Sequence, residues 1–197
     1  RGVPEQTPGS KLEALGIATD FAPGVLSAWL LEGGLRFGLG STLAFRRQDL
    51  QAIGGFESIL EYLADDYELG NRIAKRNLKI ELSRSVVETH LPAYDLKGFL
   101  SHQLRWARTI RASRPAGYAG LLLTFTLPWA LATLLFASGS PWSGRLLVVA
   151  LIARYLMAWM IASPVLNDNA SLRYGWMLPI RDCLAALVWI GGLLGRK

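Results

Sequence analysis

The sequence predicts an α/β region followed by membrane-spanning helices. Two patterns lead to this prediction. Segments with strand character alternate with short helices in the first half of the chain, where nearly all acidic side chains lie. By contrast, residues 118–197 contain only two acidic side chains, Asp168 and Asp182, and are rich in apolar residues. We therefore expect two different structural parts joined in one chain.

The strands are expected at 35–46 and 78–89. The first segment, LRFGLGSTLAFR, is rich in aromatic and β-compatible residues, and Gly38 and Gly40 allow another backbone to approach closely. The second, LKIELSRSVVET, alternates apolar and polar residues. Both patterns are typical of strands in a sheet.

Short helices are expected around these strands. Residues 10–32 have helical periodicity interrupted at Pro23, which predicts two short helices or a helix and a loop, with no evident chemistry. A helix beginning after Arg46 should end at Gly54, since glycine suits a left-handed C-terminal cap. An amphipathic acidic helix should follow at 62–76.

Three apolar segments follow, at about 118–138, 146–163 and 176–194. The first carries no charge and is long enough to cross a hydrocarbon core of ~30 Å. The second contains Arg154, whose partner could be Asp168, Asp182 or a lipid headgroup. The third is interrupted by Pro179, Arg181 and Asp182 and is the weakest of the three.

The formal net charge of +6 is compatible with nucleic acid or an anionic lipid surface, and the position of the basic residues favours lipid and no nucleic acid as the partner. The basic residues cluster at 105–114, directly before the apolar segments, which also predicts a cytoplasmic location for this end of the first span. The single cysteine, Cys183, excludes an internal disulfide. The chain begins at Arg1 within a loop-like run, so we expect it to be a fragment of a longer protein.

An acidic cluster, Ala64-Asp65-Asp66-Tyr67-Glu68, follows a Gly-Gly-Phe turn. A carboxylate beside a substrate hydroxyl can act as a general base. The alternative is a solvated pair of carboxylates favoured by the helix dipole.

A second cluster, His102-Gln103-Leu104-Arg105-Trp106, lies in a predicted helix after Asp95. Helical spacing places His102, Arg105 and Trp106 on one face. Such a face can hold a phosphate through the arginine and a sugar or lipid against the indole. The alternative is an interfacial helix whose arginines reach lipid headgroups.

The two clusters together support a family resemblance. The stretch GSTLAFRRQDLQAIGGFESILEYLADDYELGNRIAKRNLKIELSRSVVETH, with HQLRWARTIR and the apolar tail, resembles ceramide glucosyltransferases and their bacterial relatives over nearly the whole chain. The resemblance implies the acceptor-side half of a GT-A (nucleotide-diphospho-sugar transferase) domain at 1–95, an interfacial helix at 96–117 and a transmembrane region at 118–197. It also implies inverting sugar transfer on the cytoplasmic membrane face.

The same resemblance implies the site residues. Asp66 in the acidic-Asp-Tyr motif is the candidate catalytic base, and Asp65 would orient it. Arg105 would lie near the donor diphosphate and Trp106 on the acceptor side. The family's (Gln/Arg)-x-x-Arg-Trp motif begins with Gln or Arg, whereas this sequence has His102 at that position and Gln103 one place later. His102 is therefore expected to substitute for the family's Gln or Arg. Both His102 and Gln103 are expected to take part in donor or acceptor binding.

No Asp-x-Asp is present in the sequence. Mg²⁺ or Mn²⁺ is therefore expected to bind mainly to residues upstream of this chain. Without those residues, the 197-residue chain is expected to be inactive. His90 has no second histidine or acidic partner at metal spacing and is expected to have a structural or surface role.

The resemblance therefore implies a glycolipid-synthesising enzyme that transfers glucose from UDP-glucose to a membrane lipid hydroxyl such as that of ceramide. One alternative is a hopanoid-type enzyme that uses UDP-N-acetylglucosamine. The other is a non-catalytic membrane protein that binds anionic lipid.

Overall fold

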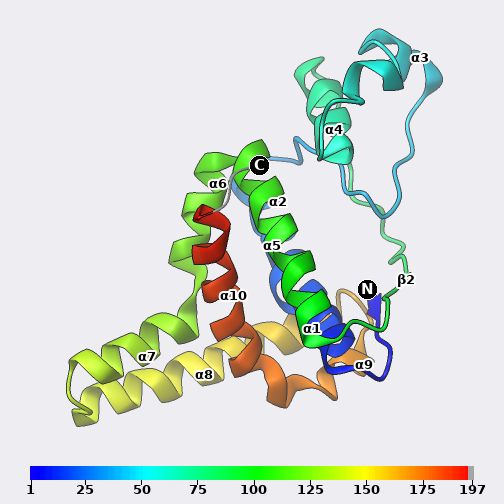
Figure 1. Cartoon of the computed structure of the whole chain (residues 1–197). Helices are drawn as coiled ribbons and strands as arrows, with labels where there is room; N and C mark the ends of the chain where they lie inside the picture. Colours follow the sequence, from blue (N-terminus) through cyan, green and yellow to red (C-terminus); the bar gives the residue numbers. More distant parts are fainter. Residues whose placement is uncertain (195–197) are drawn as a thin grey trace. The chain divides into compact units, whose positions relative to one another are not determined.

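The computed structural model describes residues 1–194 and contains two compact units. The first unit comprises residues 1–22 and the chain from His90 onward, and the second comprises residues 23–89. Figure 1 shows both as predominantly helical.

The elements of the first unit are β1 (Gly2–Val3), α1 (Pro8–Gly16), the π-helix η1 (Ile17–Phe21), β2 (Thr89–His90), α5 (Leu96–Ser113), α6 (Pro115–Gly120), η3 (Leu121–Thr124), α7 (Thr126–Phe136), α8 (Pro141–Ala162), α9 (Asn169–Leu172), η4 (Gly175–Met177) and α10 (Leu178–Leu193). Those of the second unit are α2 (Ala22–Leu31), α3 (Arg47–Ala52), η2 (Phe56–Ile59) and α4 (Asp65–Lys75). The chain passes between the units twice. It does so within α2, between Ala22 and Pro23, and within β2, between Thr89 and His90.

The prediction of an α/β, GT-A half-domain is wrong. The described residues form a predominantly helical structure with one two-stranded sheet, β1 with β2. The expected strands at 35–46 and 78–89 form a single bridge, between Leu35 and Ile80. Of residues 78–89, only Thr89 also belongs to a strand, β2. A strand needs a neighbouring ladder to bond its backbone, and the described residues give these segments no longer ladder.

The expected interruption at Pro23 is a π-helical turn between two helices. The N–H of Ala22 bonds the carbonyl of Ile17, the i−5 pattern of a π-helix. Proline has no N–H, so Pro23 cannot bond the carbonyl four residues before it, that of Thr19. The helix continues nonetheless, and Pro8–Leu31 forms one 24-residue run that is long and apolar enough to cross a membrane.

Helix α8 begins with Pro141 in its first turn and α10 with Pro179 in its first turn, where a missing N–H costs nothing. Pro179 therefore starts the third apolar helix and does not interrupt it. The runs Pro141–Ala162 and Gly175–Leu193 are both long and apolar enough to cross a membrane, which confirms the second and third predicted segments at the level of length and composition.

The first predicted span is bent. Residues Pro115–Thr124 and Thr126–Phe136 meet at an angle of 54°. The break lies at Phe125, shortly before Pro128, and the indole of Trp129 donates a hydrogen bond to the carbonyl of Leu122 across it (2.7 Å). This pair is either a broken span or a re-entrant segment.

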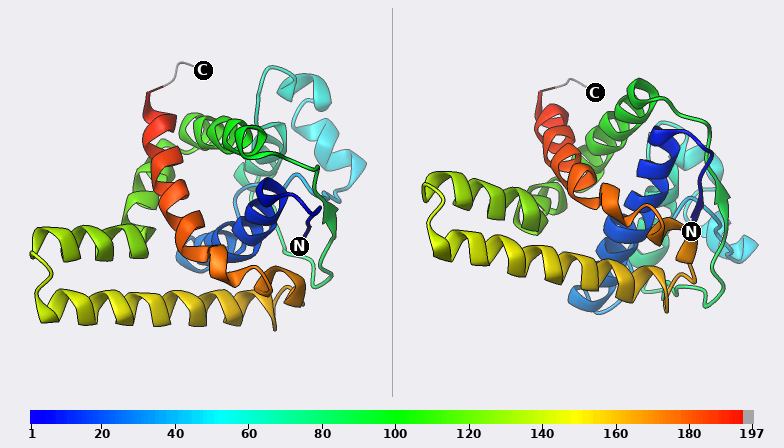
Figure 2. Two further views of the ribbon diagram at one scale, coloured as in Figure 1. Left: turned by 60° about the horizontal axis from the view of Figure 1, so that its bottom comes forward. Right: turned by 90° about the horizontal axis from the view of Figure 1, so that it is seen from below.

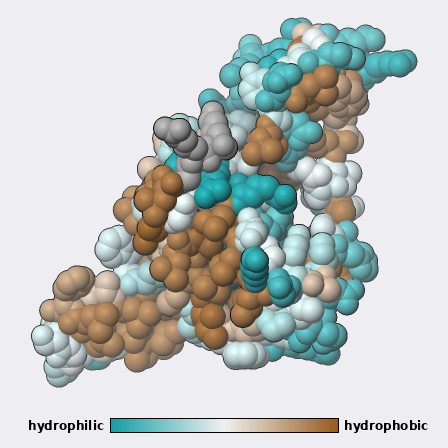
Figure 3. Space-filling view, in the orientation of Figure 1, coloured by the Kyte–Doolittle hydropathy of each residue, from teal (hydrophilic) through white to brown (hydrophobic). Residues whose placement is uncertain are grey.

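Helices α7 and α8 run side by side as a hairpin, which both views of Figure 2 show. Large apolar side chains cover it, and the surface in this region is mostly brown in Figure 3. Those exposed by half or more include Trp129, Leu135, Phe136, Trp142, Val149 and Trp159. A surface of this kind is stable in hydrocarbon and unfavourable in water.

The core of the first unit lies where α1, α5, α8 and α10 meet. Its buried residues are Leu12, Leu15, Phe99, Ala158, Met177 and Leu178. Phe99 on α5 is 1% exposed, so α5 is held against this core by its own apolar face. Asp95 caps the helix, because its Oδ1 accepts a hydrogen bond from the Gly98 N–H (2.6 Å).

In the second unit α4 packs on the segment around Phe37. The rings of Phe37 and Tyr67 stack with centroids 5.8 Å apart. A methyl group on Gly70 would lie 2.0 Å from the N of Gly38, so glycine is required at that contact. The expected C-terminal cap of α3 is confirmed, since Gly54 has a φ of +95°.

Candidate functional site

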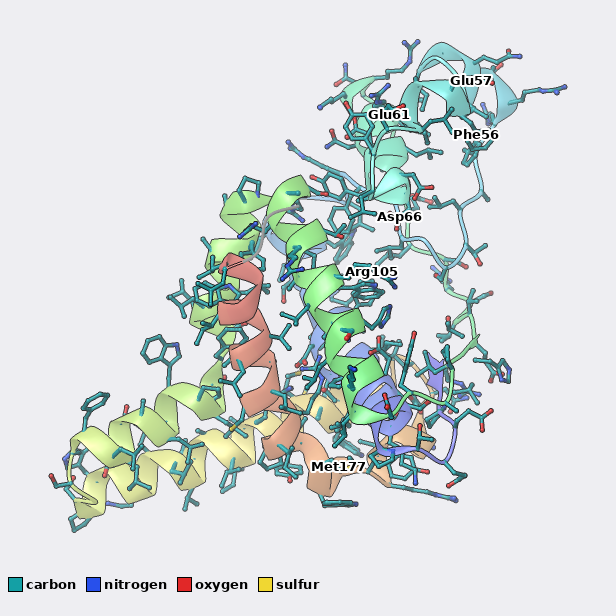
Figure 4. All side chains as sticks on the ribbon, in the orientation of Figure 1. Phe56, Glu57, Glu61, Asp66, Arg105 and Met177 are labelled. Atoms are coloured by element: carbon teal, nitrogen blue, oxygen red, sulfur yellow. The ribbon has the colours of Figure 1, made fainter. Side chains whose placement is uncertain are left out.

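The acidic cluster lies at the N-terminus of α4, where Figure 4 labels Asp66. The Asp65 Oδ1 accepts a hydrogen bond from the backbone N–H of Asp66 (2.8 Å), which fixes the first turn. Asp66 is half-buried and Asp65 is exposed. One carboxylate therefore orders the turn and the other remains available.

Two glycines lie against Asp66. A methyl group on Gly40 would be 2.7 Å from Asp66 Oδ2, and one on Gly38 would be 2.4 Å from the Asp66 carbonyl oxygen. The close backbone approach that the sequence predicted is confirmed at Gly38, whereas at Gly40 the close neighbour is the Asp66 side chain. The chain at Gly38 and Gly40 restricts where the carboxylate can lie.

Elsewhere in the second unit, the Arg72 guanidinium binds Glu68 Oε1 at 2.8 Å, which raises the arginine pKa, and Lys79 beside Glu81 lowers the pKa of that carboxyl group. Both pairs are ordinary exposed or half-exposed ion pairs and contribute little.

The second cluster lies on α5 in the first unit. The rings of His102 and Trp106 have centroids 5.3 Å apart, one helical turn from each other. Tyr94 stacks on His102 at 5.3 Å and 22°, and Phe21 lies 6.0 Å from Trp106. Four rings thus form one row of neighbours, from Tyr94 through His102 and Trp106 to Phe21.

A pocket of about 270 Å³ opens beside this row, lined by Tyr94, Gly98, Ser101, His102 and Arg105. Arg105, labelled in Figure 4, is exposed, and within residues 1–194 its guanidinium has no hydrogen-bond or ion-pair partner. A cation next to a hydroxyl and an imidazole suits an anionic or hydroxyl-bearing ligand.

Gln103 is not among the residues that line this pocket and contacts α1 instead. Its Nε2 donates a hydrogen bond to Glu13 Oε2 (2.6 Å), and its Oε1 lies 3.5 Å from Arg181 Nη2. His102 Nδ1 lies 3.5 Å from the same Glu13 oxygen. The carboxylate of Glu13 on α1 is buried, with a side chain 3% exposed.

Arg181 continues this chain of contacts into a buried charge cluster. Its Nη2 lies 2.9 Å from Asp20 Oδ2, and Asp20 Oδ1 accepts from Arg154 Nη2 (2.6 Å). Arg154 in turn pairs with Asp182. The acidic partners of Arg154 are thus Asp182 and Asp20. The sequence suggested Asp182 and did not suggest Asp20. Asp168, which it also suggested, instead binds Ser171 in α9.

Comparison with known families identifies the chain. A model of a protein family described as Glycosyl transferase family 21 matches residues 1–197. This chain belongs to glycosyl transferase family 21. The family includes ceramide glucosyltransferases. No solved structure gives a significant match to the chain.

Family membership makes this chain part of a glycosyltransferase, which requires a sugar donor and an acceptor. The residues that the sequence singled out lie in two places, Asp65 and Asp66 on α4 and His102, Arg105 and Trp106 on α5. The structure brings together the members within each group, as the helical spacing predicted for α5.

Sequence reasoning missed Glu13 and Asp20 in this family member. Both lie in the segment 10–32, where no chemistry was evident. A usable signal was present, because an ionisable residue in an apolar helix requires a partner inside the protein. Arg154 is such a residue, and one of its partners, Asp20, lies in the run Pro8–Leu31, which the sequence did not identify as a span.

The described residues 1–194 contain no group of three or more His, Cys, Asp or Glu side chains that could hold a metal ion. Asp65 and Asp66 are adjacent carboxylates, and Asp65 Oδ1 already accepts from the Asp66 N–H. These two residues do not form the oxygen cage that Mg²⁺ prefers, so we derive no step through a metal.

Proposed function

We propose that this protein is an inverting glycosyltransferase that transfers glucose from UDP-glucose to a hydroxyl of a membrane lipid such as ceramide. The observation that carries the proposal is the family match over residues 1–197. The helices that are long and apolar enough to cross a membrane support a lipid acceptor, because a two-chain lipid stays in the bilayer.

Asp66 is the proposed general base. As the acceptor oxygen attacks the anomeric carbon, Asp66 takes the hydroxyl proton and the bond to UDP breaks. Single displacement of this kind inverts the anomeric centre and needs one base. The contacts at Gly38 and Gly40 support the role, since they limit the positions available to the carboxylate, and Asp65 would orient the turn.

Arg105 is proposed to face the diphosphate of the donor, where a positive charge stabilises the departing nucleotide. Its exposed guanidinium, without a partner in the described residues, supports this role. Trp106 is proposed to contact the acceptor, and His102 to act in place of the family's Gln or Arg. Gln103 contacts Glu13 on α1.

A Mg²⁺ or Mn²⁺ ion on the donor diphosphate remains part of the proposal, with ligands other than the residues described. We also propose that the catalytic part lies on the cytoplasmic face. The basic residues of α5 between Arg105 and Arg114, next to an apolar segment, support this orientation.

The proposal is tested with membranes that contain the full-length protein, supplied separately with labelled UDP-glucose and UDP-N-acetylglucosamine. We expect a labelled glucosyl lipid that increases when ceramide is added. A labelled N-acetylglucosaminyl lipid would favour the hopanoid-type enzyme. No labelled lipid from either donor, together with retained binding to anionic vesicles, would favour the non-catalytic alternative.

A further inference from the structure

We propose that Glu13 is a positioning residue, which holds His102 so that its Nε2 accepts a hydrogen bond from a hydroxyl of the lipid acceptor. The inference rests on the proposed function, because it assigns an acceptor contact to the pocket on α5. Glu13 itself does not reach that pocket, whose lining comprises Tyr94, Gly98, Ser101, His102 and Arg105.

The imidazole of His102 contacts two aromatic rings and a carboxylate. Tyr94 stacks on it and Trp106 lies tilted beside it, each with a ring centroid 5.3 Å away. Its Nδ1 edge is buried and turned toward Glu13 Oε2 at 3.5 Å. His102 also lines the pocket. Because Nδ1 is buried against Glu13, Nε2 is the ring nitrogen left for a ligand there.

The distance of 3.5 Å is longer than a well-formed hydrogen bond, and Nδ1 has no hydrogen-bond partner in the described residues. Contacts of this kind are often long without substrate and shorten when it binds. A carboxylate facing Nδ1 favours the tautomer with the proton there, which leaves Nε2 as an acceptor. A hydroxyl can donate to that acceptor, whereas an ionised diphosphate has no proton to give.

Glu13 is itself held in place. Gln103 donates to Glu13 Oε2 at 2.6 Å and reaches toward Arg181. Gly16 leaves room for that arginine, because a methyl group there would lie 2.5 Å from Arg181 Nη2. This arrangement explains why a carboxylate is buried at 3% exposure in α1, where an apolar residue would be less costly.

The test is a double-mutant cycle in the full-length protein in membranes, with Glu13→Gln, His102→Gln and the double variant. Glu5→Gln, at an exposed position before α1, is the matched control. We expect Glu13→Gln to lower kcat/KM for the lipid acceptor by about tenfold, the value of one positioned hydrogen bond, with the KM for the UDP-sugar unchanged. In the His102→Gln background the same change should cost less than about twofold.

Equal losses from Glu13→Gln in both backgrounds would overturn the proposal, because Glu13 would then act independently of His102. The proposal would also be overturned if Glu13→Gln raised the KM for the UDP-sugar and left kcat/KM for the lipid acceptor unchanged, because His102 would then contact the donor. If the wild-type protein makes no glycolipid, the proposed function fails; if it does and Glu13→Gln matches Glu5→Gln, only this inference fails.

A second measurement does not depend on activity. Nitrogen NMR of ¹⁵N-histidine-labelled protein in bilayers reports which ring nitrogen carries the proton, and the His102 signal is identified by its loss in His102→Gln. We expect the proton on Nδ1 in the wild type and a loss of this preference in Glu13→Gln. A wild-type ring protonated on Nε2 alone would contradict the proposal even if the variants fold poorly.

Discussion

Arg154 and Asp182 form a two-point ion pair between α8 and α10. Arg154 Nε donates to Asp182 Oδ2 and Nη2 donates to Oδ1, both at 2.7 Å. The third nitrogen, Nη1, donates to the carbonyl of Thr19 at 2.8 Å, the carbonyl that Pro23 cannot bond. A single arginine thus joins two apolar helices to the π-helical turn of a third.

Replacing Arg154 should therefore destabilise the first unit. Arg154→Met leaves Asp182 and the Thr19 carbonyl buried without a partner, and breaking a buried pair costs about 3–5 kcal/mol. We expect lower thermal stability in detergent, whereas Arg145→Met, at an exposed position of the same helix, should change little. Arg154→Met combined with Asp182→Leu should recover part of the loss. Equal melting temperatures for the two single variants would contradict this role.

Gly40→Ala should reduce turnover without unfolding the second unit. The new methyl group would lie 2.7 Å from Asp66 Oδ2 and force the carboxylate to move. A misplaced base loses rate because proton transfer needs hydrogen-bond distance. We expect kcat to fall by about tenfold or more, measured as glycolipid formed per minute. Gly24→Ala is the control, since nothing lies within 4 Å of a methyl group there. If Gly40→Ala were as active as Gly24→Ala, the contact between Gly40 and Asp66 would have no role in turnover.

Arg105→Gln should lower kcat by roughly 10²–10³, the usual effect of removing one group that stabilises transition-state charge. The matched control on the same helix is Lys97→Gln, which removes an exposed cation from the first turn of α5. Steady-state kinetics with varied UDP-sugar would show the difference. Equal effects of the two variants would mean that α5 contributes only general positive charge.

Local patterns predicted the short helices and the apolar runs well. Gly54 ends α3 because its φ of +95° suits glycine, and the spacing of His102 and Trp106 places their rings together on α5. These outcomes depend on neighbours within one helical turn. Sequence periodicity reports such contacts directly.

Contacts between distant segments were not predictable. Residues 35–46 have a strand pattern, but within the described residues they have one bridge and pack on α4. Pro179 looked like an interruption, and it is compatible with a helix only because it lies in the first turn. Glu13 binds Gln103, and Asp20 binds Arg154 and Arg181. These partners lie far away along the chain, so local sequence patterns do not indicate them.

The most direct test of the central claim is sugar transfer by Asp66→Asn in the full-length protein in membranes. If Asp66 is the base, glycolipid formation should fall by about 10²–10⁴ while UDP-sugar binding and membrane insertion are retained. Asp65→Asn should lose less, and Glu61→Gln, at an exposed position of the same unit, should retain wild-type activity. Wild-type turnover in Asp66→Asn would contradict the assignment of Asp66 and the mechanism built on it.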